Sequence, residues 1–272
     1  MKRRHLVELG DLPWWPRVFR DAATDYLVTA IRVTKTYIGL APRLAAALKR
    51  SGATQITDLC SGGGGPWEDL LPAVRAEGAD VSLCLTDLYP NTAAWAKIAA
   101  SVPGVLCEAE SVSATDVPER LTGFHTLFTA FHHFRPADAR EILAAAVRDR
   151  QGIAIFEGTS RAPVALAMML VVPAIVWLMT PVIRPFGWSR LFWTYVVPII
   201  PVAVLFDGIV STLRTYTPDE LAAMAREVAS EEYDWEAGFE YAAGSPIPLP
   251  FLIGTPRRPE AQTRRPMSQS PL

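Results

Sequence analysis

Short apolar segments alternate with amphipathic segments along most of the chain, and this alternation limits the possible folds more than any other feature. Between residues 55 and 158 the apolar segments are QITDLC, DVSLCLTD, VLCEAESV, TLFTAF and GIAIFEG. The segments between them have helical spacing, as in the stretch from Pro66, in NTAAWAKIAASV and from Ala137 to Arg150. Nearly continuous apolar strands that alternate with helices are typical of a mostly parallel sheet covered on both faces. We therefore predict an α/β, doubly wound fold.

The flanking segments complete this prediction. Residues 17–52 have apolar residues at helical spacing and predict two N-terminal helices. In TPDELAAMAREVASE we expect Thr217 to cap a helix, with Pro218 in its first turn and Glu220 at the capping-box position. YDWEAGFEYA and PFLIGTP, joined by the turn-rich GSPIPL, predict an antiparallel C-terminal hairpin. The predicted sheet is therefore seven-stranded and mostly parallel.

The 272 residues divide into five predicted regions. They are N-terminal helices that form a lid (1–52), the first part of the core (53–161), an apolar helical insertion (162–211), the last helix and hairpin of the core (212–256) and a polar, proline-rich, disordered tail (257–272).

The glycine-rich stretch ITDLCSGGGGPWEDLL, residues 56–71, predicts a ligand site. A buried strand ends in Asp58, four glycines follow, and Pro66 opens a helix. Such a turn lies where doubly wound sheets bind ligands, although a flexible connector is the alternative. A dinucleotide fingerprint is disfavoured because Trp67 stands where the third glycine belongs, and no GK[ST] follows to make a P-loop.

This stretch resembles the first motif of class I S-adenosylmethionine-dependent methyltransferases. The resemblance implies S-adenosylmethionine as the cofactor, with Asp58 near its amino group and Gly62 and Gly64 beneath its amino-acid end. Cys60 and Ser61 would lie in the same loop. Cys60 departs from the family pattern, which commonly has glycine there, but cysteine is small enough to be tolerated.

The next strand, in LCLTDLYPN, ends in Asp87. A carboxylate there can accept both ribose hydroxyl groups of the cofactor, and a helix cap is the alternative role. By the same resemblance, Leu88 would lie against the adenine.

The position near the adenine amino group is less clearly marked. In AESVSATDVP, Ser113 with Ala114 best fits the family register, and Glu110 and Asp116 remain alternatives. Ala130, in TLFTAF, is assigned to the cofactor site as well.

Two adjacent histidines, His132 and His133, follow the fourth apolar segment and are candidates for catalysis. Methyl transfer depends mainly on positioning, and a general base is needed only when the acceptor carries a proton. An imidazole could remove that proton, or the histidines could simply form the turn and cover the cofactor. Glu157 is the next candidate, together with Arg161; a local ion pair or helix cap is their alternative role.

Aromatic residues of the N-terminal region could line a lid over the acceptor. They are Trp15, Tyr26 and Tyr37, and the alternative is that they belong to the core.

Residues 162–206 are unusually apolar, with no acidic residue and only Arg184 and Arg190 charged. The uncharged run 163–183 reaches the roughly 20 residues of a membrane-spanning helix, whereas 191–206 falls short of it. Both runs are broken by prolines, which are Pro173, Pro181, Pro198 and Pro201.

Two arginines in the short turn RPFGWSR oppose the positive-inside tendency if both runs span. A re-entrant or interfacial membrane contact through 163–206, with Trp188, Trp193 and Tyr195 at the headgroup level, fits better. The alternative is a helical cap buried in a homodimer or over an apolar substrate pocket.

Composition excludes several other functions. Twenty-six basic and 28 acidic residues give a charge of −2, which argues against nucleic acid as a partner. Three widely spaced cysteines indicate reduced thiols and a cytoplasmic location, and no N-terminal stretch has the length of a signal peptide. With the apolar insertion, the predicted location is cytoplasmic and membrane-associated. No CxxC pair exists and only one pair of histidines is close, so no metal site is predicted.

Together these features predict methyl transfer from S-adenosylmethionine to a lipid or another apolar small molecule. Two alternatives remain: the same fold with different chemistry, and a membrane-attached binding or scaffold protein with a non-catalytic fold of this class.

Overall fold

The computed structural model describes residues 1–184, 186–242 and 246–257. The predicted tail beyond Arg257, and residues 243–245 at the start of the hairpin turn, lie outside this range.

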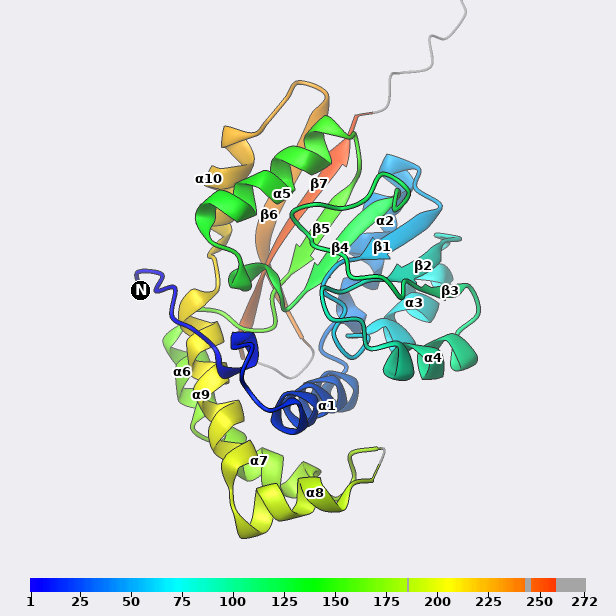
Figure 1. Ribbon diagram of the computed structural model, residues 1–272. Coiled ribbons are helices and arrows are strands. Elements are labelled where there is room, and N and C mark those ends of the chain that lie inside the picture. Colours follow the sequence, from blue (N-terminus) through cyan, green and yellow to red (C-terminus); the bar gives the residue numbers. More distant parts are fainter. Residues whose placement is uncertain (185, 243–245, 258–272) are drawn as a thin grey trace, which may run out of the picture.

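Seven strands form one sheet, and the order across it is β3-β2-β1-β4-β5-β7-β6. The strands are β1 (Gln55–Asp58), β2 (Ser82–Leu85), β3 (Val105–Cys107), β4 (Phe124–Phe128), β5 (Ile153–Phe156), β6 (Tyr233–Tyr241) and β7 (Pro248–Pro256). Neighbours among β1 to β5 pair in parallel, and β7 is antiparallel to both β5 and β6. This confirms the predicted mostly parallel sheet with its C-terminal antiparallel hairpin (Figure 1).

The strand order reverses between β1 and β4. The chain first moves outward from β1 to β3 and then returns to the other side of β1. Ligands of doubly wound proteins bind outside the carboxyl ends of the strands at such a point.

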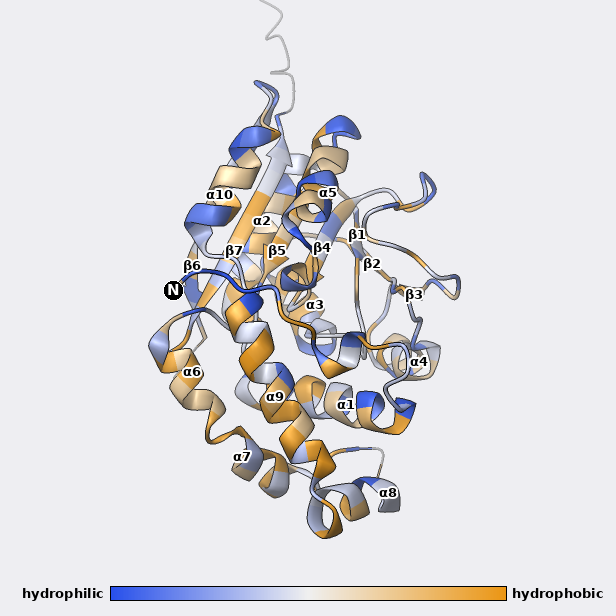
Figure 2. Ribbon diagram, turned by 60° about the vertical axis from the view of Figure 1, so that its left-hand side comes forward, coloured by the Kyte–Doolittle hydropathy of each residue, from blue (hydrophilic) through white to orange (hydrophobic). Residues whose placement is uncertain are grey.

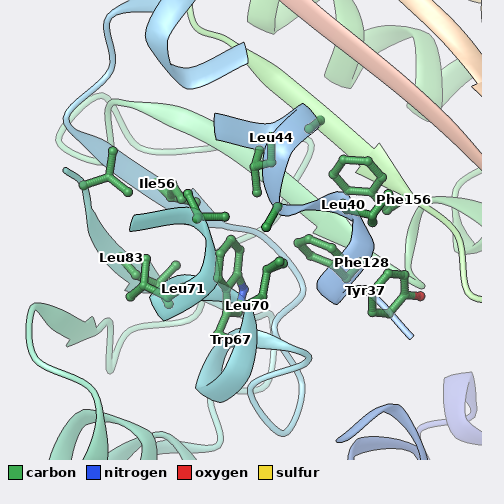
Figure 3. Close-up of a cluster of buried hydrophobic side chains, with 14 of the residues drawn as sticks. Tyr37, Leu40, Leu44, Ile56, Trp67, Leu70, Leu71, Leu83, Phe128 and Phe156 are labelled. Atoms are coloured by element: carbon green, nitrogen blue, oxygen red, sulfur yellow. The ribbon is translucent and has the colours of Figure 1, made fainter. Parts of the chain in front are cut away.

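Helices cover both faces of the sheet, because central strands such as β4 and β5 carry apolar side chains on both sides. On one face lie α2 (Ala41–Ser51), α3 (Trp67–Ala76) and α4 (Thr92–Ser101), whose side chains form one core with the strands. Figure 3 shows Trp67 of α3 in this core, and its ring lies 5.3 Å from that of Phe128. On the other face α5 (Pro136–Arg148) and α10 (Pro218–Glu227) form a second core. The expected capping box of α10 is present, between Thr217 and Glu220.

The two predicted N-terminal helices are α1 (Arg17–Thr34) and α2. The helix α1 packs on the glycine loop: a Cβ atom on Gly63 would lie 2.9 Å from Val28 Cγ2 and 3.1 Å from Thr24 Cγ2. It therefore lies at the edge of the sheet where β1 ends.

The apolar insertion consists of short helices that project from this edge (Figure 1). They are α6 (Pro163–Met169), α7 (Val172–Met179), α8 (Trp188–Leu191), a π-helical turn (Phe192–Val196) and α9 (Ile199–Arg214). Pro173 lies in the first turn of α7 and Pro198 is the N-cap of α9, positions at which the missing N–H of proline costs no helical hydrogen bond. Val176, Ile183 and Ile200 pack against Ala22 and Tyr26 of α1.

Within the described residues, no individual helix combines the length and the apolar character that crossing a bilayer requires. One bent pair, Trp188–Val196 followed by Ile199–Arg214, meets the criterion jointly, with a bend of 79°.

Candidate functional site

Asp58, at the end of β1, is buried and orders the glycine loop. The Thr126 hydroxyl lies 2.6 Å from one carboxylate oxygen of Asp58, and the Ser61 hydroxyl lies 2.7 Å from the other. Ser61 also links β1 to β2, because its hydroxyl accepts the Thr86 N–H at 3.2 Å. Burial raises the pKa of Asp58 to about 7, against the opposing effect of these hydrogen bonds. The predicted cofactor residues Asp58 and Ser61 thus hold one another at the start of the loop.

Asp87, at the end of β2, holds the other side of the loop. Its carboxylate accepts the Gly62 N–H and the Tyr89 N–H, each at 2.8 Å. The Trp95 indole N–H donates to the Gly62 carbonyl at 2.9 Å. The alternative role as a cap of α4 belongs instead to Asn91, which accepts the Ala94 N–H. Asp87 therefore faces the glycine loop, and burial raises its pKa.

The backbone of the loop is left-handed at several positions. Gly62 has φ 51° and Gly64 has φ 101°. A Cβ atom on Gly64 would lie 2.1 Å from Ile98 Cδ1, so the Ile98 side chain would have to shift, and the positive φ also favours glycine there. A Cβ atom on Gly62 would make only an ordinary van der Waals contact, at 3.9 Å from Thr24 Cγ2, so the left-handed backbone and not packing favours glycine there.

Cys60 also adopts a left-handed conformation, with φ 60°. This region favours glycine, which explains on physical grounds why glycine is common at this position in the resembled family. Burial raises the pKa of the Cys60 thiol, so it is not a reactive thiolate.

The remaining predicted cofactor residues lie near the end of β2 or β4. Leu88 is 48% exposed beside Asp87. The segment with Ser113 and Ala114 adjoins it, because the Val112 N–H donates to the Asp87 carbonyl at 2.9 Å. Glu110 is exposed and forms an ion pair with Arg120, which favours Ser113 and Ala114 over this alternative. Asp116, the other alternative, is exposed, and Ala130 is buried at the turn after β4.

His132 is buried within a charged cluster behind the sheet edge. Its side chain is 1% exposed, and Nδ1 lies 2.7 Å from Glu157 Oε2. Burial alone would lower the pKa of His132, but Glu157 and Glu8 raise it to about 10. The structure thus brings together two residues that were predicted separately, His132 and Glu157.

His133 is half-buried, and its ring lies against that of His132 with centroids 4.4 Å apart and an interplanar angle of 33°. Its Nδ1 lies 2.8 Å from Asp11 Oδ1, and Arg214 bonds Asp11 Oδ2 at 2.6 Å. Sequence reasoning missed Glu8, Asp11 and Arg214 as members of this cluster. The available signal was the pair of acidic residues in an otherwise basic and apolar N-terminal segment.

Arg161 does not pair with Glu157. It forms an ion pair with Glu220 of the α10 capping box and donates to the Met1 carbonyl at 2.7 Å. Arg161 therefore anchors the N-terminal segment to α10.

A cavity of about 590 Å³ lies between α1, the insertion and the carboxyl ends of β4 and β5. Most of its lining is apolar and comes from α1, α6, α7 and α9. All three predicted lid aromatics line it, namely Trp15, Tyr26 and Tyr37. The Tyr37 hydroxyl lies 2.5 Å from the Thr129 hydroxyl at the inner end. Thr24 lines the cavity and also lies against the glycine loop, so the two regions adjoin.

The raised pKa of Asp58 predicts a dependence of stability on pH. The folded protein holds this proton up to about pH 7, whereas the free carboxyl has a pKa of 3.8. The protonated Asp58 carboxyl therefore contributes its full stabilisation to the free energy of unfolding below pH 4, and this stabilisation is lost as the pH rises toward 7. Between about pH 5 and about pH 7 the wild-type free energy of unfolding should fall by about 2–3 kcal/mol more than that of Asp58→Asn.

Denaturant unfolding of both proteins at the two pH values, without added ligand, measures this difference. Asp116→Asn, at an exposed carboxyl, is the matched control and should follow the wild type. Parallel curves for wild type and Asp58→Asn would show that Asp58 is already ionised in the folded protein.

Comparisons with known proteins bear on the fold. No known family profile and no curated protein matches the sequence. Among solved structures, the plantazolicin methyltransferase BpumL in complex with SAH has a TM-score of 0.56 at 11% identity, over 92% of this chain and 94% of that chain. A putative O-methyltransferase from Nostoc punctiforme has a TM-score of 0.48 at 13% identity, over 93% of this chain and 64% of that chain.

The mitomycin 7-O-methyltransferase MmcR has a TM-score of 0.44 at 15% identity, over 82% of this chain and 54% of that chain. The chain thus spans nearly all of BpumL but less than two thirds of the other two. At these identities the similarity to BpumL shows a shared fold.

Proposed function

We propose that this chain, which has the class I methyltransferase fold, transfers the methyl group of S-adenosylmethionine to an apolar small molecule or a lipid. The fold expected from the glycine-rich motif is confirmed. The observation that carries the proposal is the apolar cavity that adjoins the glycine loop at the reversal of the strand order.

The residues at this edge suit the cofactor. Glycine at position 62 leaves the backbone without a side chain where a ligand would approach it, and the half-buried Asp87 carboxylate retains lone pairs for hydroxyl groups. Leu88 presents an exposed apolar side chain next to it. SAH in the BpumL structure is consistent with the same cofactor. Bound S-adenosylmethionine supplies a methyl group on a sulfonium, and the chain's own part is to hold cofactor and acceptor in line.

The lining of the cavity indicates the class of acceptor. Methionine, valine and alanine side chains of α6, α7 and α9 supply much of its wall. Small-molecule sites of this kind bind apolar ligands and orient them with a few polar groups. Here the polar groups near the sheet are Thr129, Tyr37, Thr159 and Glu8. His132 and His133 adjoin Glu8, and Glu157 pairs with His132; we propose that this polar cluster lies beside the acceptor.

We further propose that the insertion contacts a membrane surface. Its outer side chains are apolar and exposed, and they include Leu178 (79%), Trp188 (78%) and Val196 (68%). Figure 2 shows hydrophobic residues along α7 and α9, away from the sheet. The same helices line the cavity on their inner side, so an apolar acceptor in the bilayer would have a short route to the glycine loop. A homodimer that buries this face is the competing arrangement.

A labelled-methyl assay against a total lipid extract and a pool of small molecules tests the proposed reaction. We expect label in an apolar product, and heat of S-adenosylmethionine binding in calorimetry. A binding or scaffold protein without cofactor affinity would give neither heat nor labelled product. Heat of S-adenosylmethionine binding without transfer of the labelled methyl group to any lipid or small molecule would favour the same fold with different chemistry.

Filling the cavity should block the acceptor and spare the cofactor. Ala30 of α1 lines the cavity, and Ala30→Phe would add a ring to this space. We expect methyl transfer to fall by about 10-fold or more with nearly unchanged cofactor affinity, because acceptor positioning is lost.

Val33→Phe is the matched control, since Val33 lies on the same helix, is 69% exposed and does not line the cavity. Equal activity of both variants would place the acceptor elsewhere.

A further inference from the structure

Glu8 of the N-terminal segment lies near Nε2 of both adjacent histidines, His132 and His133. His132 Nε2 is 3.5 Å from Glu8 Oε1, and His133 Nε2 is 3.8 Å from Glu8 Oε2. One ligand atom from each of the three residues lies within 4.8 Å of the others. Ligands bound at 2.0–2.1 Å to one tetrahedral ion lie about 3.3 Å apart. The separations are therefore too long for good hydrogen bonds and close to those of ligands that share an ion.

His132 Nε2 is an unpartnered polar atom in a buried place. The side chain is 1% exposed, and Nε2 makes no hydrogen bond within the described part of the chain. Buried polar atoms are nearly always satisfied, so an atom of this kind needs an explanation. It points toward Glu8, where an ion would satisfy it.

The opposite nitrogens of both rings are held by carboxylates. Nδ1 of His132 lies 2.7 Å from Glu157, and Nδ1 of His133 lies 2.8 Å from Asp11. Metal-binding histidines commonly donate their second ring N–H to a carboxylate, which fixes the ring and raises its basicity. In both imidazoles, Nδ1 is thus bonded to a carboxylate and Nε2 is the nitrogen that could bind a metal ion.

The charge of the surroundings favours a cation. Three carboxylates surround the rings, from Glu8, Asp11 and Glu157. Arg214 forms ion pairs with Glu8 and Asp11. Arg3 and Arg214 each donate a hydrogen bond to the His132 carbonyl. Three carboxylates face two guanidinium groups, so one further positive charge balances the cluster, and a bound cation can supply it in place of a proton on an imidazole.

We propose that Glu8, His132 and His133 bind one divalent transition-metal ion of the type of Zn²⁺. Two imidazole nitrogens and one carboxylate oxygen form a donor set that suits such ions and leaves a further coordination position. Half-buried His133 gives access from solvent, and Glu8 also lines the cavity. The sequence predicted no metal site because it has no CxxC pair and only one close pair of histidines; the third ligand comes from the distant N-terminal segment. This proposal does not depend on the proposed methyl transfer.

Zinc binding to the tag-free, chelator-treated full chain tests the proposal. We expect calorimetry and metal analysis to give one Zn²⁺ per chain. Co²⁺ added in place of Zn²⁺ should give visible absorption bands of nitrogen and oxygen ligation. His133→Ala and Glu8→Gln should each weaken Zn²⁺ binding by about 100-fold or more, and Asp11→Asn, which loses a supporting carboxylate, by about 10–100-fold.

His5→Ala is the matched control, because His5 belongs to the same N-terminal segment but not to the cluster. It should bind Zn²⁺ as the wild type does. His133 is half-buried, so His133→Ala should fold even if Glu8→Gln does not, and circular dichroism checks both. No Zn²⁺ bound to the wild type, or equal affinity in wild type and folded His133→Ala, would overturn the proposal.

Discussion

Replacing Asp87 by alanine is expected to weaken S-adenosylmethionine binding by about 10–150-fold. This factor corresponds to the roughly 1.5–3 kcal/mol that a hydrogen bond to a charged group contributes. Asp87 is the proposed acceptor for the ribose hydroxyls and also accepts the Gly62 N–H at 2.8 Å. The substitution therefore removes a ligand contact and one of the bonds that shape the glycine loop.

Isothermal calorimetry with S-adenosylmethionine measures the effect, and a thermal melt verifies folding. Asn91→Ala is the matched control, because Asn91 caps the helix that follows Asp87 and has no proposed contact with the cofactor. It should lower stability by about 1 kcal/mol and leave affinity unchanged. A folded Asp87→Ala protein with wild-type affinity would remove Asp87 from the cofactor site.

The second large effect is expected on membrane binding. Leu178, Trp188 and Val196 would each bury an apolar side chain on contact with a bilayer, at about 1.5–3 kcal/mol apiece. Replacing all three by serine should therefore reduce binding to neutral phosphatidylcholine vesicles by more than about 1,000-fold. Binding of the wild type should resist high salt, because burial of apolar surface is not screened as charge attraction is.

Vesicle co-sedimentation measures this partition, with and without salt. A matched triple variant, Val33→Ser with Leu106→Ser and Phe239→Ser, removes exposed apolar side chains outside the insertion and should bind as the wild type does. Light scattering without vesicles gives the oligomeric state. A wild-type protein that stays in the supernatant would contradict membrane contact, and a dimer that the Leu178, Trp188 and Val196 substitutions dissociate would assign the face to self-association.

Several predictions from the sequence depend on local patterns, and the structure agrees with them. The alternation of apolar segments predicted the parallel strands, and the turn before PFLIGTP predicted the antiparallel pair of β6 and β7. Thr217 and Glu220 form the expected capping box. In each case the residues that carry the pattern are close in sequence, and helix or strand periodicity alone decides their conformation.

Local patterns predicted less well how the insertion is arranged. The run 163–183 has the length of one spanning helix, but it folds as α6, α7 and a following segment. Hydropathy reports the composition of such a run and not where its helices end. Their ends depend on prolines and on packing against α1, through contacts such as that of Val176 with Tyr26.

By itself, the sequence determined the order of strands and helices, the glycine loop and the residues at the strand ends. Only the tertiary structure decided which distant groups meet. It placed Glu8 beside His132, paired His132 with Glu157, and enclosed a cavity between α1 and the insertion. The physical reason is that secondary structure follows from periodic local preferences. The partner of a buried charge, in contrast, can lie anywhere in the sequence, and only the folded chain brings the two groups into contact.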